Sequence, residues 1–300
     1  MTATLLPQLL PDSAPHIYAD LAYFQPPPNG EVPWTTQYPA PGGKSRQSNV
    51  TPKHVQFPIY DLRGVDPAQT AIDVTGFQIV PDIEERKTKM KYEDWQDEGK
   101  IAEVYYPEVE RLLKKVTGAS KVIIFDHTVR RAEREGEETP DEPTNRKPVP
   151  LVHVDQTEQS GARRVLRHAE SKEEGERLLR GKAKLVNLWR PFKTVYDMPL
   201  AYADARTLSR DDLVKSRLLY KPPTPEGETY QVQLNPNHRF YYLSEMQPDE
   251  ALMLQCWTND ESGGPMTPHT AFKDERYFGK EGVELRESIE IRSLLFFDTE

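Results

Sequence analysis

Alternating apolar and polar positions fill the second half of the chain and predict a series of short β-strands. The expected strands cover residues 150–155, 183–192, 198–205, 230–243, 251–257 and 288–297. Earlier in the chain, strands are expected at 54–62, at 72–80 and in the apolar run Lys121–Phe125. Many short strands with few helices between them are typical of a barrel or jelly roll.

Helical periodicity is strongest between residues 92 and 117, where apolar side chains recur mostly at three- and four-residue steps. Gly118 is expected to end this helix, and Pro107 is expected to kink or divide it. Two shorter helices are expected at about 171–180 and 209–220. The predicted fold class is therefore mainly β, with helices that support a jelly-roll core.

The chain is expected to form one domain, 1–300, in three parts. Residues 1–50 hold many prolines and aromatic residues without periodicity, which predicts an extended N-terminal arm over the body of the domain. Residues 51–132 supply strands and the support helix, and residues 150–300 supply the barrel with the catalytic site. Between them, 133–148 is polar, acidic and broken by proline. This surface loop is interpreted as a tether, with a lid over the site as the alternative.

Composition and charge narrow the range of partners. The net charge of −9 argues against a broad phosphate-binding surface, so no nucleic acid is expected. No window approaches the run of about 18 apolar residues that a membrane span needs, and the N-terminus does not resemble a signal peptide. Cys256 is the only cysteine, which excludes an internal disulfide and a Cys-rich metal site. A small-molecule substrate and a cytoplasmic location are the resulting expectations.

His153 and Asp155 stand two positions apart in a predicted strand, so both side chains face the same side. His269, in the motif Thr267-Pro268-His269, lies far downstream and completes a set of two histidines and one carboxylate. Such a set holds Fe(II) and leaves positions open for O₂ and a co-substrate. The sequence therefore predicts a catalytic iron site at these three residues. The structural alternative for His153 is a partly buried histidine bonded to its neighbour.

Arg286 and Ser288 follow the third ligand and share one face of the next strand. A guanidinium fork and a hydroxyl together match the distal carboxylate of 2-oxoglutarate, which predicts that this dicarboxylate is the co-substrate. Arg292 has the same parity and is the alternative carboxylate partner. The structural alternative for Arg286 is an exposed surface arginine.

Four further residues have both a functional and a structural interpretation. Arg190 lies in an apolar strand, where it either binds a carboxylate inside the barrel or is satisfied by neighbouring groups. Its neighbour Trp189 either contacts the substrate or packs in the core. Arg163 and Arg164 either line the mouth of the substrate site or form a solvated basic turn. Two rival functions are a cupin-type metal enzyme without 2-oxoglutarate and a non-catalytic binding protein.

Sequence motifs along nearly the whole chain match one family. The most specific are Asn187-Leu188-Trp189-Arg190-Pro191 and Pro268-His269-Thr270-Ala271-Phe272. Others are Asp61-Leu62-Arg63-Gly64, His153-Val154-Asp155-Gln156-Thr157, Gly161-Ala162-Arg163-Arg164, Met246-Gln247-Pro248-Asp249-Glu250-Ala251 and Arg286-Glu287-Ser288. The chain resembles the fungal hydroxylase/desaturase family typified by AsaB, with gibberellin desaturase and CmcJ as relatives. This resemblance implies a double-stranded β-helix (cupin-like) fold, Fe(II), and hydroxylation, desaturation or cyclisation of a fungal secondary metabolite.

Overall fold

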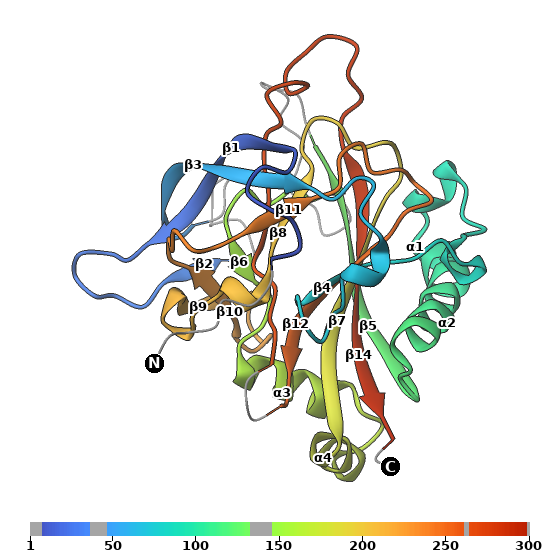
Figure 1. Cartoon of the computed structure of the whole chain (residues 1–300). Coiled ribbons are helices and arrows are strands. Elements are labelled where there is room, and N and C mark those ends of the chain that lie inside the picture. Colours follow the sequence, from blue (N-terminus) through green and yellow to red (C-terminus); the bar gives the residue numbers. More distant parts are fainter. Residues whose placement is uncertain (1–7, 37–46, 133–145, 261–263, 299–300) are drawn as a thin grey trace.

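Two curved β-sheets form the body of the protein (Figure 1). The computed structural model describes residues 8–36, 47–132, 146–260 and 264–298. In spatial order the nine-stranded sheet contains β1 (His16–Gln25), β3 (Thr51–Asp61), β11 (Phe240–Tyr242), β8 (Leu200–Ala203), β13 (His269–Ala271), β6 (His153–Val154), β10 (Gly227–Val232), β9 (Leu213–Leu219) and β2 (Trp34–Thr36). The five-stranded sheet contains β4 (Phe77–Ile79), β12 (Leu252–Thr258), β7 (Lys182–Pro191), β14 (Glu287–Phe297) and β5 (Lys121–Arg131). The predicted jelly-roll class is confirmed.

The helix expected between residues 92 and 117 is present in pieces. It contains a 3₁₀ turn (Tyr92–Gln96), α1 (Glu98–Lys100), a π turn (Ile101–Tyr105) and α2 (Tyr106–Thr117). Pro107 lies in the first turn of α2, directly after the π turn. Gly118 ends α2 in the left-handed conformation, with φ of 74°. The expected division and end of this helix are both confirmed.

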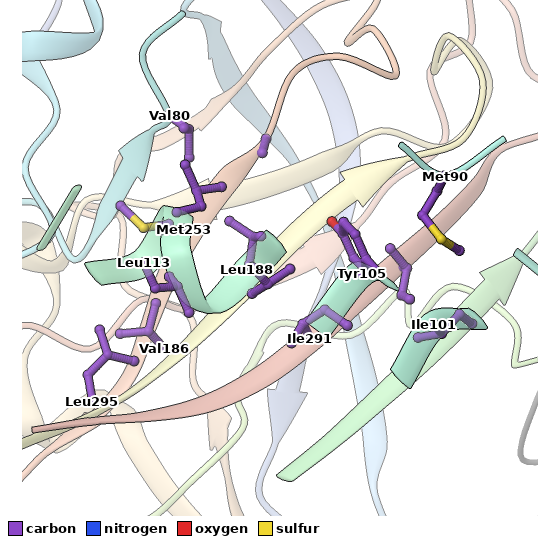
Figure 2. Packing of buried hydrophobic residues seen from close by; sticks show 14 of the residues in the cluster. Val80, Met90, Ile101, Tyr105, Leu113, Val186, Leu188, Met253, Ile291 and Leu295 are labelled. Atoms are coloured by element: carbon purple, nitrogen blue, oxygen red, sulfur yellow. The ribbon is translucent and has the colours of Figure 1, made fainter. Parts of the chain in front are cut away.

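The helix α2 covers the outer face of the five-stranded sheet, and the apolar side chains of this contact are shown in Figure 2. Leu113 of α2 belongs to the same buried cluster as Val186 and Leu188 of β7 and Ile291 of β14. Because side chains alternate along a strand, the neighbouring residues of β7 and β14 face the other way, into the space between the two sheets. That inner face carries the candidate site.

One expected helix, at 209–220, is wrong. Ser209 and Asp212 form a capping box around a short 3₁₀ turn at the start of this segment. The chain then continues as strand β9, which pairs with β10 along six residues. Val214 and Ser216 pair with Gln231 and Thr229 there, so sheet pairing overrides the local helix signal.

The helix α4 (Lys172–Arg180) is confirmed, whereas α3 (Glu158–His168) was not expected. Thr157 caps α3 by accepting a hydrogen bond from the backbone N–H of Ser160. Most of the loop predicted at 133–148 lies outside the described residues.

The expected N-terminal arm is part of a sheet. β1 pairs with β3 from His16 to Gln25, and β2 pairs with β9. Several expected strands are shorter than predicted, because irregular segments flank the residues that pair. The segments concerned are 72–80, reduced to β4; 150–155, reduced to β6; 198–205, reduced to β8; and 230–243, divided into β10 and β11.

Candidate metal centre

His153 and His269 lie directly opposite each other on the neighbouring strands β6 and β13. Their ring centroids are 4.5 Å apart. Nδ1 of His153 donates a hydrogen bond to the carbonyl oxygen of Leu151 (2.7 Å), and Nδ1 of His269 donates to that of Thr267 (3.0 Å). These bonds place the proton of each ring on Nδ1, because a carbonyl can only accept. Each Nε2 therefore presents a lone pair to the same space.

Asp155 faces both imidazoles, although it follows β6 rather than lying within it. Its Oδ1 is 3.4 Å from Nε2 of His153 and 4.0 Å from Nε2 of His269. The candidate ligand atoms of the three residues all lie within 4.8 Å of one another. The other oxygen, Oδ2, accepts a hydrogen bond from the side-chain amide of Asn187 over 2.7 Å. Asn187 therefore holds the carboxylate with Oδ1 toward the histidines.

The donor set fits a divalent cation. Two neutral imidazole nitrogens and a carboxylate oxygen repel each other unless a positive charge lies between them. Burial and the neighbouring His153 lower the pKa of His269, so this ring is neutral at pH 7. Burial raises the pKa of Asp155, but the adjacent imidazole of His153 and the charge of Arg292 outweigh it and hold that pKa well below its ordinary value. The site therefore presents two lone pairs and one negative charge, as non-haem Fe(II) requires.

The guanidinium of Arg292 contacts carboxylates of the protein itself. Its Nε lies 3.5 Å from Oδ2 of Asp155, its Nη1 is 3.0 Å from Asp126, and its Nη2 bonds to Glu290. Burial lowers the pKa of Arg292, but these carboxylates outweigh that effect and raise it. The alternative assignment of Arg292 to the co-substrate is therefore wrong. It stabilises a metal ligand instead.

A cavity adjoins the two histidines and extends to Arg286. It is lined by Arg130, Val149, His153, Trp189, Leu200, His269, Thr270, Ala271, Arg286 and Glu290. Arg286 is buried, which excludes the surface alternative; its Nε donates to Oγ of Ser288 (3.3 Å) and its Nη1 to the carbonyl oxygen of Met198 (2.9 Å). Burial, together with repulsion from Arg130, lowers the pKa of Arg286 to about 9. Its guanidinium is charged at neutral pH and faces this cavity.

Trp189 lines this cavity and a second, mostly apolar cavity beside it. The guanidinium carbon of Arg286 lies 5.0 Å from the centre of a Trp189 ring. The indole N–H is buried without a hydrogen-bond partner among the described residues, as is the hydroxyl of Tyr202 in the second cavity. Both groups can donate a hydrogen bond to a bound molecule, which agrees with a substrate role for Trp189.

Arg190 points away from this cavity, so its predicted role in binding the co-substrate is wrong. Its guanidinium donates to the hydroxyl of Tyr105 (3.0 Å) and to the carbonyl oxygens of Pro248 (2.9 Å) and Arg86. Arg190 alternates with Trp189 along β7 and so faces the helical layer.

Arg163 and Arg164 do not line the cavity either. Both lie on α3, where Arg163 pairs with Glu228 (2.9 Å) and the guanidinium of Arg164 lies over the ring of Phe125 (5.4 Å). The structure therefore places their charges against other groups of the protein, in a helix rather than in the expected turn.

Three residues of the site were not predicted from the sequence: Asn187, Arg130 and Glu290. Asn187 shares the inner face of β7 with Trp189, and this parity was the available signal. Arg130 was missed because the expected strand stopped at Phe125, whereas β5 continues to Arg131. Glu290 lies between Ser288 and Arg292 on the inner face of β14, and its only signal was that parity.

Comparison with known proteins agrees with this geometry. Residues 21–296 match a family model described as an oxidoreductase/YMDC permease-like domain. Within the described part of the chain, each helix is too short or too polar to cross a membrane. The chain is 34% identical to the hydroxylase/desaturase efuI of Hormonema carpetanum, over 80% of this chain and 83% of that protein. It is 32% identical to the alpha-ketoglutarate-dependent dioxygenase tstK of Talaromyces stipitatus, over 82% of this chain and 87% of the relative.

Solved structures agree on the fold. The iron and alpha-ketoglutarate-dependent endoperoxidase NvfI superposes with a TM-score of 0.80 over 96% of this chain and 99% of that one, at 24% identity. Fold and site together define a metal-binding double-stranded β-helix protein. The chain belongs to the family of fungal hydroxylase/desaturases and 2-oxoglutarate-dependent dioxygenases that these relatives represent.

Proposed function

We propose that this protein is an Fe(II)- and 2-oxoglutarate-dependent oxygenase that hydroxylates, desaturates or cyclises a small molecule of fungal secondary metabolism. Its relatives of known type carry the same class of activity. The observation that carries the proposal is the convergence of His153, Asp155 and His269 beside a cavity that also contains a buried arginine.

His153, Asp155 and His269 would hold the iron. Bound iron supplies the activation of O₂, with 2-oxoglutarate as the reductant that leaves as succinate and CO₂. The backbone carbonyls of Leu151 and Thr267 keep both imidazoles in the tautomer with a free Nε2. Such outer hydrogen bonds fix ligand orientation and strengthen metal binding.

Arg286 and Ser288 would bind the distal carboxylate of 2-oxoglutarate. Both are buried on the inner face of β14, and the Arg286 guanidinium lines the cavity without an ion-pair partner in the described part of the chain. The apolar side chains around the cavity beside Trp189 would face the organic substrate. Positioning a C–H bond near the iron is the contribution that this surface would make to selectivity.

This arrangement favours the proposal over the two rivals. A cupin-type enzyme without 2-oxoglutarate would have no use for a buried arginine without an ion pair, which is costly to a fold. A non-catalytic relative would have no use for three converging ligand atoms. Neither rival accounts for both features.

The direct test is formation of succinate from 2-oxoglutarate by the purified protein with Fe(II), ascorbate and O₂, in the absence of added substrate. Slow, iron-dependent succinate formation is the expected result, because enzymes of this class consume 2-oxoglutarate without substrate at a low rate. His269→Ala should abolish it, and Arg163→Ala, a change on α3 outside the cavity, should not. Equal rates in wild type and the His269 variant would contradict the assignment.

A small-molecule substrate is consistent with the family. We also propose that the protein acts in the cytoplasm, where ferrous iron and 2-oxoglutarate are available. Fractionation of cells that express the tagged protein tests this, and enrichment in a membrane or secreted fraction would contradict it.

A further inference from the structure

A second arginine, Arg130, lies beside the residues assigned to the co-substrate. Arg130 on β5 is the direct cross-strand partner of Ser288 on β14. Directly opposite residues of an antiparallel pair point to the same face, with their Cβ atoms about 5 Å apart. Ser288 in turn accepts a hydrogen bond from Arg286 (3.3 Å). The three side chains therefore gather at one end of the cavity, and both arginines line it.

Carboxylates of the protein offset the charges of these two arginines without forming an ion pair among the described residues: Glu290 for both, Asp197 for Arg286 and Asp155 for Arg130. The hydrogen bond that Arg130 makes through its side chain goes to the carbonyl oxygen of Lys147 (3.0 Å). Arg286 donates to a carbonyl and a hydroxyl, and neither guanidinium forms an ion pair with a carboxylate of the described residues. Glu290 also lines the cavity, but Arg292 holds its carboxylate.

Two like charges that face one cavity favour an anion between them. Burial lowers the pKa of both arginines, and repulsion from Arg130 lowers that of Arg286 further. A carboxylate between the two guanidinium groups would relieve the repulsion and form charge-assisted hydrogen bonds with both.

We propose that Arg130 binds the distal carboxylate of 2-oxoglutarate together with Arg286 and Ser288, so that two arginines clamp the co-substrate. This inference rests on the proposed function. The strand register favours the distal carboxylate over the one at the metal. Arg130 lies directly opposite Ser288. Ser288 is four residues along β14 from Arg292, and Arg292 contacts the metal ligand Asp155.

The test compares two 2-oxo acids that differ in the distal carboxylate. Binding of 2-oxoglutarate and of 2-oxopentanoate, which has the same chain length without that carboxylate, is measured anaerobically by calorimetry on the Fe(II)-loaded protein. Arg130→Gln should raise the Kd for 2-oxoglutarate at least tenfold and leave the Kd for 2-oxopentanoate and for Fe(II) unchanged. Arg131→Gln is the matched control, because Arg131 lies next in β5 and pairs with Glu287 (2.8 Å) outside the cavity.

Two results would overturn the inference. An unchanged Kd for 2-oxoglutarate in Arg130→Gln would show that Arg130 does not bind the co-substrate. Equal weakening for both 2-oxo acids would place Arg130 at the carboxylate next to the metal instead. If the glutamine variant does not fold, Arg130→Lys answers the same question, with a smaller loss expected because it keeps the charge and loses the fork. Failure of wild type to bind 2-oxoglutarate at all would contradict the proposed function itself.

Discussion

Asn187 donates a 2.7 Å hydrogen bond to Oδ2 of Asp155, and this bond connects the five-stranded sheet to a ligand carried by the nine-stranded sheet. It leaves Oδ1 of Asp155 toward the two histidines. A residue of the opposite sheet therefore sets the orientation of the carboxylate. The geometry of the candidate metal site thus depends on the distance between the two sheets.

Asn187→Leu removes this donor at nearly constant volume. We expect the affinity for Fe(II) to fall by about 10- to 100-fold, the usual effect of losing a group that orients a metal ligand. Competition with a metal chelator under anaerobic conditions measures the affinity. Asn187→Asp should also change the affinity for Fe(II), because it adds a second negative charge beside Asp155. An unchanged affinity in the leucine variant would show that Asn187 does not orient the ligand.

Arg286→Ala should weaken 2-oxoglutarate binding by about 1.5–3 kcal/mol, the range for a hydrogen bond to a charged group. Iron binding should be retained, because Arg286 does not touch the ligands. Arg292→Ala should show the opposite pattern, with weaker iron binding, since Arg292 is 3.5 Å from Asp155 and neutralises Glu290. Calorimetric titration with each ligand measures both effects. The same pattern in both variants would contradict the separate roles.

Arg190→Met should destabilise the fold without affecting the site. It removes three hydrogen bonds and leaves the carbonyls of Pro248 and Arg86 without that donor, so we expect a loss of about 3 kcal/mol in the free energy of unfolding. Arg217→Met is the matched control, since Arg217 forms a solvent-exposed pair with Glu226 that contributes little to stability. Urea denaturation measures both. A large loss of 2-oxoglutarate affinity in Arg190→Met would restore the discarded co-substrate role.

The environment of His238 predicts that the stability of the folded protein depends on pH. It is buried between Asp212 (3.0 Å) and the hydroxyl of Tyr23 (3.1 Å), and burial lowers its pKa below 6.5 despite the nearby carboxylate. The unfolded chain therefore binds more protons below pH 6.5, so the stabilising contribution is full above that pH. It decreases as the pH falls through the folded pKa.

His238→Gln should reduce this acid sensitivity, although it lowers stability at neutral pH. Urea denaturation of wild type and variant across the range from neutral to mildly acid pH provides the measurement. His54→Gln, at an exposed position on β3, serves as the control. If the His238 variant loses stability with falling pH as steeply as wild type, another group is responsible.

The fold class and the convergence of His153, Asp155 and His269 could be predicted because their signals are local. His153 and Asp155 alternate in an apolar segment, and the motif around His269 is specific. The direction of Arg190 could not be predicted, since an arginine in an apolar strand is satisfied equally well by carbonyls or by an anion, and only the position of α2 decides between them. Arg130 and Asn187 acquire their roles through cross-strand register, which pairs residues far apart in the sequence.

Local signals were also misleading where sheet pairing overrode them. The capping box at Ser209 is present, yet the residues that follow it pair with strand β10 instead of continuing as a helix. Conversely, the residues after Asp155 are mostly polar, although they form helix α3. Few residues of this helix are buried: Ser160, Gly161 and Val165. Propensity alone could not resolve either case.

The most direct test of the central claim is an anaerobic titration of the purified protein with Fe(II) and then with 2-oxoglutarate, followed by visible absorption. The account predicts one iron per chain and a weak charge-transfer band that appears only when both components are present. His269→Ala should show neither at the same concentrations, while it retains the wild-type far-ultraviolet circular dichroism. A wild-type protein that binds iron but develops no band with 2-oxoglutarate would contradict the account.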